Sequence, residues 1–148
     1  MIEIIDDLKI KDNVNIKVYD KGQLVQEITD HNVVTEDGLN LLRDFMRGES
    51  PDYLEFFAVG DSTQDISSTY SNLPSEVSRN TITSFTPSDQ NLNVRYFLPS
   101  GVANGSTLRT AGIFNSSSSG VMFAGVDHEA IQKTSSISVT YSWDIDLG

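Results

Sequence analysis

The residues that could do chemistry in this chain are a serine and, much later, an acidic residue next to a histidine. Residues 59–63 have the sequence VGDST, and Ser62 follows an apolar run that predicts a β-strand. Asp127 and His128 are adjacent. A serine deprotonated by a histidine, which an acidic residue orients, is the arrangement used in nucleophilic hydrolysis. A serine hydrolase is therefore the enzymatic hypothesis that these residues raise.

The sequence around these residues argues against a hydrolase. Residues 60–62 resemble the nucleophile block of GDSL-type hydrolases, whose Asp and His lie three residues apart near the end of a parallel α/β chain. Here Asp127 and His128 are adjacent, and the sequence pattern lacks the helices that such a fold requires. A polar turn after a strand is the better interpretation of residues 59–63, and we expect no catalytic residue.

Metal and cofactor sites are not predicted either. The chain has no cysteine, which excludes thiolate ligands, and its two histidines, His31 and His128, are far apart in the sequence. The closely spaced carboxylates are Asp61 with Asp65 and Asp144 with Asp146. Neither pair belongs to a loop of alternating oxygen ligands around a glycine, as in a typical calcium site. The glycines form neither a P-loop nor a dinucleotide-binding motif, so we expect no cofactor.

The charge of the chain argues against a nucleic-acid partner. Its 148 residues include 21 acidic and 10 basic residues, a net charge of −11 that repels phosphate backbones. No apolar run approaches the roughly 20 residues of a membrane span. Residues 1–12 lack the basic start and long apolar stretch of a signal peptide. We therefore expect no membrane partner, and we expect the protein to be made and kept in a cytoplasm unless it leaves as part of a larger particle.

Most of the chain has the residue pattern of β-strands. Residues 14–18 alternate apolar and polar side chains, and a Gly-containing turn at residues 20–23 joins them to residues 24–28, which predicts a β-hairpin. Residues 53–60 form an almost continuous apolar run, as expected of a strand covered on both faces. Residues 80–84 indicate a further strand.

The C-terminal half continues this pattern. Residues 92–98 alternate, and the Asn104–Gly105 pair predicts a hairpin turn before a strand at residues 108–114. In the last segment, residues 137–147, apolar residues that include Trp143 share one face and polar residues share the other. This alternation is typical of an antiparallel sheet with one wet face.

One amphipathic helix is predicted at about residues 35–47. Thr35 is a suitable N-cap, and acidic residues follow it in the first turn. Apolar residues then recur at spacings of three and four, and Gly48 can end the helix in the left-handed conformation. The apolar positions are Leu39, Leu42, Phe45 and Met46.

These elements predict a mainly β protein, an antiparallel, jelly-roll-like β-sandwich with one packed helix. We expect a single domain over residues 13–148, preceded by an arm or edge strand at residues 1–12. The apolar residues of this arm are Ile2, Ile4, Ile5, Leu8 and Ile10. They form either another edge strand of the same fold or an arm that adds to the sheet of a neighbouring subunit.

Six segments, in this order, resemble a family of small virion structural proteins of tailed bacterial and archaeal viruses, which are tail, baseplate or fibre-attachment components. The segments are HNVVTEDGLNLL (31–42), FAVGDST (57–63), LPSEVSR (73–79), LRTAGIFN (108–115), GVMFAGV (120–126) and IQKTSSISVTYSWDI (131–145). Together they span most of the chain from the first hairpin onward. The chain departs from the family at Gly60–Asp61–Ser62, where Gly-Thr-Gly is frequent. Thr110 and Gly125 stand where the family usually has an acidic residue and commonly has an arginine.

The resemblance implies a virion structural protein that binds other copies of itself and other virion proteins. We expect an oligomeric tail, baseplate or fibre-anchoring component, with a capsid decoration or vertex turret protein as the alternative. A carbohydrate-binding module would need exposed aromatic residues on one flat face, whereas Tyr53, Tyr70 and Tyr96 are scattered.

Individual residues of the six segments have expected structural roles. Residues 108–114 and 120–126 should be antiparallel neighbours joined by a flexible, exposed hairpin tip, and Gly112 should permit a bulge or close packing. Glu76 and Arg79 should form a structural ion pair. Further structural positions are Gly38 and Gly60, and subunit contacts are expected at Ser117, Ser118 and Ser119 and in the arm.

Overall fold

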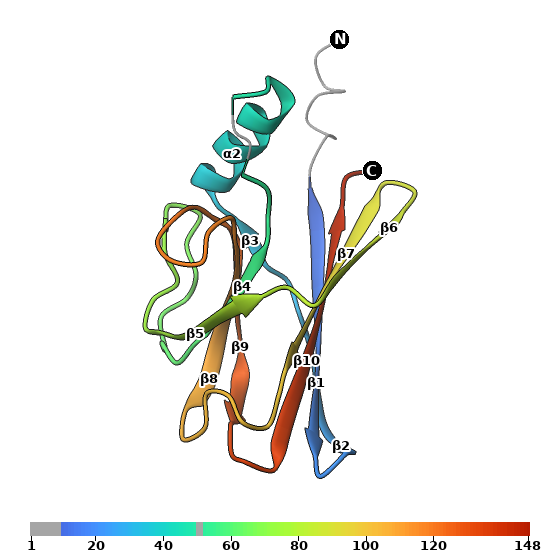
Figure 1. The fold of residues 1–148 in the computed structure, drawn as a ribbon, viewed down its shortest axis with the longest axis vertical. Helices are drawn as coiled ribbons and strands as arrows, with labels where there is room; N and C mark the ends of the chain where they lie inside the picture. Colours follow the sequence, from blue (N-terminus) through green and yellow to red (C-terminus); the bar gives the residue numbers. More distant parts are fainter. Residues whose placement is uncertain (1–9, 50–51) are drawn as a thin grey trace.

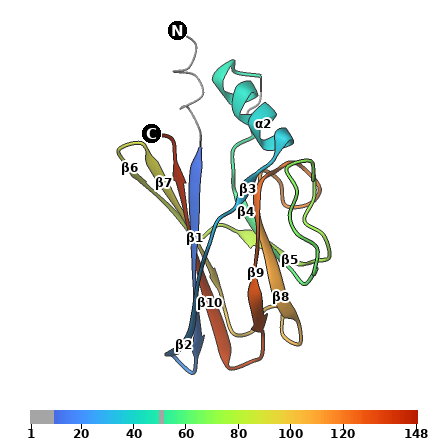
Figure 2. The same cartoon turned by 180° about the vertical axis from the view of Figure 1, so that it is seen from behind.

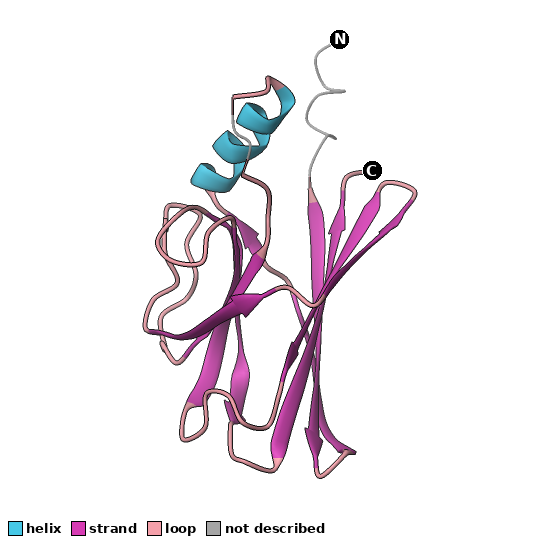
Figure 3. Cartoon of the chain, in the orientation of Figure 1, coloured by secondary structure: helices cyan, strands magenta, loops and turns pink. Residues whose placement is uncertain are grey.

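The computed structural model describes residues 10–49 and 52–148, which form two five-stranded antiparallel sheets packed as a sandwich with one short helix (Figures 1 and 3). The first sheet has the order β2 (Gln23–Asp30), β1 (Lys11–Asp20), β10 (Ile137–Asp146), β7 (Asn91–Leu98) and β6 (Ser84–Ser88). The second has the order β3 (Val33–Val34), β9 (Met122–Gln132), β8 (Thr107–Phe114), β4 (Phe56–Gly60) and β5 (Glu76–Thr81). This confirms the predicted fold class.

The alternation of apolar and polar residues along the strands determines which side chains form the core. Along β10, Val139, Tyr141, Trp143 and Ile145 are buried, whereas the polar residues between them are partly exposed. Trp143 is fully buried and lies opposite Val14 of β1 in the register. Because β10 is the central strand of its sheet, its apolar face contributes to the middle of the sandwich.

Phe57 joins the two sheets at the centre of the core. The predicted strand at residues 53–60 is β4, whose residues after Phe56 are all buried. The Phe57 ring stacks on Tyr96, with 4.7 Å between ring centroids, and meets Trp143 edge to face at 5.9 Å. Aromatic contacts of this geometry add to the free energy gained from burial alone.

The predicted helix is α2 (Glu36–Met46), and it packs against β9 (Figures 1 and 2). Thr35 is its N-cap, and its Oγ1 accepts a hydrogen bond from the backbone N–H of Gly38 at 2.8 Å. The same hydroxyl donates to the Met122 carbonyl oxygen of β9. One side chain therefore caps the helix and attaches it to the second sheet.

The predicted hairpin between β1 and β2 is confirmed. Its two turn residues, Lys21 and Gly22, have φ angles of 49° and 83°. Positive φ at both positions is the geometry that suits the twist of a two-residue hairpin, and glycine adopts it without steric cost.

The hairpin turn predicted at Asn104–Gly105 is wrong. β7 pairs with β10 and β6, whereas β8 pairs with β9 and β4, so residues 99–106 cross from one sheet to the other. Gly105 does have a positive φ of 88°, as an Asn-Gly turn favours. A local turn preference does not determine which strand pairs with which, because long-range packing decides sheet membership.

Residues 80–84 do not form one strand either. β5 ends at Thr81 in the second sheet, and β6 begins at Ser84 in the first. Between them, the N–H of buried Ile82 donates to the Glu55 carbonyl oxygen, and the N–H of Thr83 donates to the Arg95 carbonyl oxygen. The chain thus changes sheets within two residues.

The proposed boundary between arm and domain moves toward the N-terminus. β1 begins at Lys11, where it pairs with Asp146, and half-buried Ile10 packs against the core. Residues 10–12 therefore belong to the sandwich. Ile2, Ile4, Ile5 and Leu8 lie outside the described residues, so their role as subunit contacts stays a prediction.

Candidate functional site

Ser62, Asp127 and His128 do not meet to form a hydrolytic site. Asp127 and His128 are consecutive residues of β9, so their side chains project to opposite faces of the sheet. The Asp127 carboxylate accepts a hydrogen bond from the Ile66 backbone N–H at 3.0 Å. Ser62 Oγ accepts one from the Gln64 N–H, also at 3.0 Å. Both side chains thus stabilise the loop after β4.

His128 belongs to the core. Its Nδ1 lies 2.7 Å from the Glu129 carbonyl oxygen, and its Nε2 lies 3.3 Å from the Tyr141 hydroxyl oxygen. Both distances fit a neutral ring that donates from Nδ1 and accepts at Nε2. Burial lowers the pKa of His128 below its ordinary value. The hydrogen bond to the Glu129 carbonyl oxygen and, after it, the carboxylates of Asp30 and Asp127 oppose this shift only in part.

Within residues 10–49 and 52–148, no group of three or more His, Asp or Glu side chains could hold a metal ion. Of the closely spaced pair Asp144 and Asp146, the Asp144 carboxylate accepts hydrogen bonds from the side-chain amides of Asn91 and Asn93. The Asp146 carboxylate accepts one from the Gly148 N–H. In the same described ranges, no helix is both long and apolar enough to cross a membrane.

A buried lysine, which the sequence pattern did not reveal, holds the connection between the sheets. Lys133 is 1% exposed, and its Nζ donates to the carbonyl oxygens of Ser100 and Thr134 and, at 2.7 Å, to the Asn104 side-chain oxygen. The Gly105 N–H in turn donates to the Lys133 carbonyl oxygen. Burial lowers the pKa of Lys133. These bonds give this residue a structural role at the end of β9.

The structure contains the expected ion pair between Glu76 and Arg79. The Arg79 guanidinium binds both carboxylate oxygens of Glu76, at 2.6 Å and 3.1 Å, while its Cζ lies 3.6 Å from the centroid of the Phe114 ring. Its Nη1 also donates to the carbonyl oxygens of Ser116 and Ser119, at 3.0 Å and 2.8 Å. The Arg79 side chain is only 6% exposed, so this cluster lies beneath the serine loop.

The serine loop, residues 115–121, joins β8 to β9 as predicted. Ser117, Ser118 and Ser119 are exposed at its tip. The Asn115 side-chain oxygen accepts a hydrogen bond from the Val121 N–H at 2.7 Å, and Arg79 binds the loop from below. The exposed tip is thus attached to β5 as well as to its own strands, a link that the sequence pattern did not predict.

Three of the glycines in the matching segments permit close packing. A Cβ atom added to Gly38 would overlap the Phe123 carbonyl group, and one added to Gly60 would lie 2.5 Å from Thr110 Oγ1. A Cβ at Gly112 would lie 2.9 Å from Met122 Sδ. Gly112 pairs directly with Gly125, away from the register shifts of β8, so it serves close packing and not a bulge.

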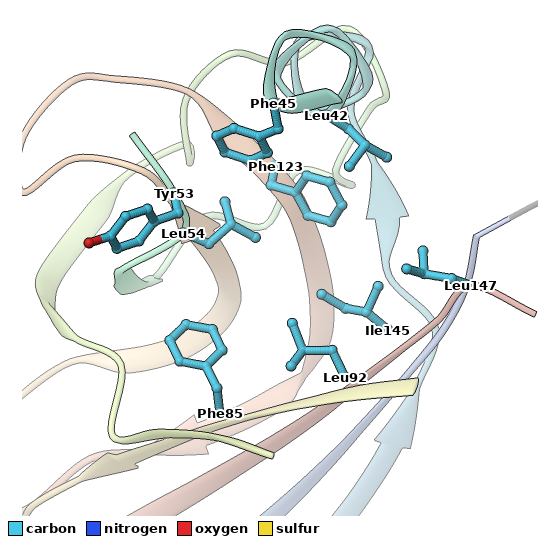
Figure 4. Close-up of a pocket in the computed structure, with 9 residues that line it drawn as sticks. All are labelled: Leu42, Phe45, Tyr53, Leu54, Phe85, Leu92, Phe123, Ile145 and Leu147. Atoms are coloured by element: carbon cyan, nitrogen blue, oxygen red, sulfur yellow. The ribbon is translucent and has the colours of Figure 1, made fainter. Parts of the chain in front are cut away.

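An apolar groove opens at the end of the sandwich, between α2 and the ends of both sheets (Figure 4). It has a volume of about 400 Å³. Its lining residues are Leu42, Phe45, Tyr53, Leu54, Phe85, Leu92, Phe123, Ile145 and Leu147. Several of these residues are predicted as apolar positions of a helix or strand, but the sequence pattern does not show that they meet, because they come from distant parts of the chain.

Large apolar side chains are also exposed on the strands at both edges of the first sheet, and one of them, Phe85, lines the groove as well. On β2, Leu24 is 51% and Val25 58% exposed, and on β6, Phe85 is 41% exposed. All five residues of β6 are exposed. The edge strands of a sheet present unpaired backbone groups that can pair with another chain. Apolar side chains at such edges favour contact with another protein.

Comparison of the chain with protein-family models, curated proteins and solved structures finds no match. The six segments quoted for the predicted resemblance are spread over both sheets. Residues 57–63, 73–79, 108–115 and 120–126 include most of β4, β5 and β8 and the start of β9, all in the second sheet, and residues 31–42 include β3 and the start of α2. Residues 131–145 include the end of β9 and most of β10, the central strand of the first sheet.

Proposed function

We propose that this chain is a non-enzymatic structural subunit of a tailed-virus particle, where it forms a symmetric oligomer with other copies and binds other virion proteins. The exposed apolar residues at the edges of the first sheet are the observation that carries this proposal. The resemblance of the six segments to virion proteins supplies the biological setting. A tail, baseplate or fibre-anchoring ring is the favoured location, and a capsid decoration or vertex turret is the alternative.

The proposed mechanism is burial of strand edges between copies. Interfaces that hold assemblies permanently bury on the order of 2,000 Å² or more and resemble a protein core. The edge strands β2 and β6 supply apolar contacts, whereas the net charge of −11 opposes association of identical subunits. The apolar contacts must therefore outweigh a long-range repulsion that salt weakens.

A charge placed on the β2 edge tests this mechanism. Val25→Asp puts a carboxylate on an exposed apolar position, so particles that assemble in its presence should contain much less of this subunit. Thr29→Asp adds the same charge to an exposed polar position of the same strand and should be incorporated normally. Quantitative mass spectrometry of washed particles, with circular dichroism of the isolated variants to establish folding, measures the difference.

Equal incorporation of the two folded variants would contradict a role for the β2 edge.

The non-enzymatic part of the proposal has its own test, because a serine-directed phosphonate should leave Ser62 unlabelled. Specific labelling of Ser62, together with ester turnover that Ser62→Ala abolishes, would establish the hydrolase instead.

A further inference from the structure

The apolar groove exposes side chains that a soluble subunit would normally cover. Tyr53 is 67%, Leu147 54% and Phe85 41% exposed. All nine lining residues are aliphatic or aromatic, and the Tyr53 hydroxyl points away from the other side chains (Figure 4). Because the groove offers no set of polar groups to orient a small ligand, its chemistry fits an apolar segment of polypeptide.

The chain enters the fold at the rim of this groove. In the register of β1 with β10, Lys11 lies opposite Asp146 and Asp12 lies opposite Ile145, which lines the groove. The next residue of the C-terminal strand, Leu147, also lines the groove. Residues 1–9 are therefore tethered beside two of its lining residues.

The described strand pairs of the first sheet end beside the groove. The last pair of β1 with β2 is Val14 with Asp30, and its last pair with β10 is Lys11 with Asp146. The Leu147 N–H donates to the Gln90 carbonyl oxygen, which holds this lining residue next to the turn between β6 and β7. The first described residues of the chain are therefore at the end of the sandwich where the groove opens.

The sequence of residues 1–9 fits an apolar groove. Five of the nine side chains are apolar: Met1, Ile2, Ile4, Ile5 and Leu8. Fully extended, nine residues reach about 30 Å. A short tether gives an effective concentration in the millimolar range, so at micromolar protein the chain's own segment outcompetes that of a second copy.

We propose that residues 1–9 fill the apolar groove of their own chain in the free subunit. The segment covers Tyr53, Phe85 and Leu147 and completes the core at this end of the sandwich. This inference goes beyond the proposed function and does not depend on it, since it concerns the subunit before assembly. On assembly, the same segment is available for exchange between neighbouring copies.

Disulfide trapping tests the proposal in the full chain. The chain has no cysteine, so within one molecule a double variant can form only the intended bond. Ile4→Cys with Tyr53→Cys places one thiol in the segment and one on the exposed wall of the groove. Ile4→Cys with Phe97→Cys is the control, because Phe97 is also exposed but does not line the groove.

At low micromolar concentration, the groove pair should oxidise to a disulfide at the mass of the monomer, and the control pair should not. A disulfide that appears only at the mass of a dimer would overturn the proposal and assign the segment to a second copy. Failure of the groove pair to oxidise, or equal oxidation of the control, would also overturn it. None of these results would contradict the function proposed above, because particle incorporation tests it separately.

Dye binding gives a second measurement that needs no cysteine. Deletion of residues 1–9 should expose the groove and raise the fluorescence of an added apolar dye several-fold, and a synthetic peptide of residues 1–9 should reverse the rise. Circular dichroism establishes that the deletion variant is folded. Unchanged dye fluorescence in a folded deletion variant would contradict the proposal.

Discussion

At the scale of single residues, the buried polar side chains of this sandwich bind mainly backbone carbonyl groups. Thr35 donates to Met122, Lys133 donates to Ser100 and Thr134, and Arg79 donates to the serine loop. Such bonds satisfy buried polar atoms, which would otherwise cost free energy, and they fix where loops lie relative to strands. These polar side chains therefore hold loops and strands in place.

His128 should make stability depend on pH. Because its folded-state pKa lies below the unfolded value of about 6.5, the unfolded chain binds more protons, and the free energy of unfolding falls as pH decreases through this range. The contribution of one histidine is at most about 1.4 kcal/mol per pH unit. His128→Gln should reduce this slope in urea unfolding between about pH 7 and 5.5, where carboxylates remain largely ionised. An unchanged slope in a folded His128→Gln variant would contradict a neutral buried ring.

At the scale of elements, the contact between α2 and β9 depends on the absence of a side chain at Gly38. Alanine at a helical glycine ordinarily stabilises a helix by about 1 kcal/mol. Here the added Cβ would overlap the Phe123 carbonyl group, which belongs to the backbone of β9 and cannot rotate away. The usual sign of the substitution should therefore reverse.

Gly38→Ala should lower the free energy of unfolding by roughly 1–3 kcal/mol, the usual cost of overpacking. Asn40→Ala, an exposed position of the same helix, is the matched control and should leave stability unchanged or slightly higher. Chemical unfolding of both variants measures the difference. A Gly38→Ala variant as stable as its control would show that α2 does not pack closely on β9.

Elements with strong local signals could be predicted from the sequence, and elements that depend on distant packing could not. β1, β7 and β10 have apolar residues at every second position, and α2 has an N-cap and a three-to-four spacing. β6 has only Phe85 and Pro87 among polar residues, and its place follows from pairing with β7. The crossing at residues 99–106 likewise depends on Lys133, which is distant in the sequence.

Some of the candidate sites could likewise be predicted from the sequence, and one could not. The pair of Glu76 and Arg79 is expected from the Glu-x-x-Arg of residues 73–79, and the serine tip because small polar residues interrupt two apolar strands. The apolar groove could not be predicted, because its walls come from α2, the segment before β4 and strands of both sheets. Only the tertiary fold brings these side chains together.

At the scale of the whole molecule, the described part of the sandwich exposes large apolar side chains at its edges and at one end. The central strands bury the aromatic core, whereas β2, β6 and the groove leave large apolar side chains exposed. Under the proposed function, such a subunit associates through these surfaces without further chemistry. Its strong negative charge opposes that association at long range, so the apolar contacts must outweigh it.

The most direct measurement is a cryo-electron microscopy reconstruction of the intact particle made by the genome that encodes this chain. We predict density for two five-stranded sheets and α2, repeated around a symmetry axis of the tail, with β2 and β6 against neighbouring subunits. A reconstruction that resolves the particle's proteins and contains no copy of this fold would contradict the account.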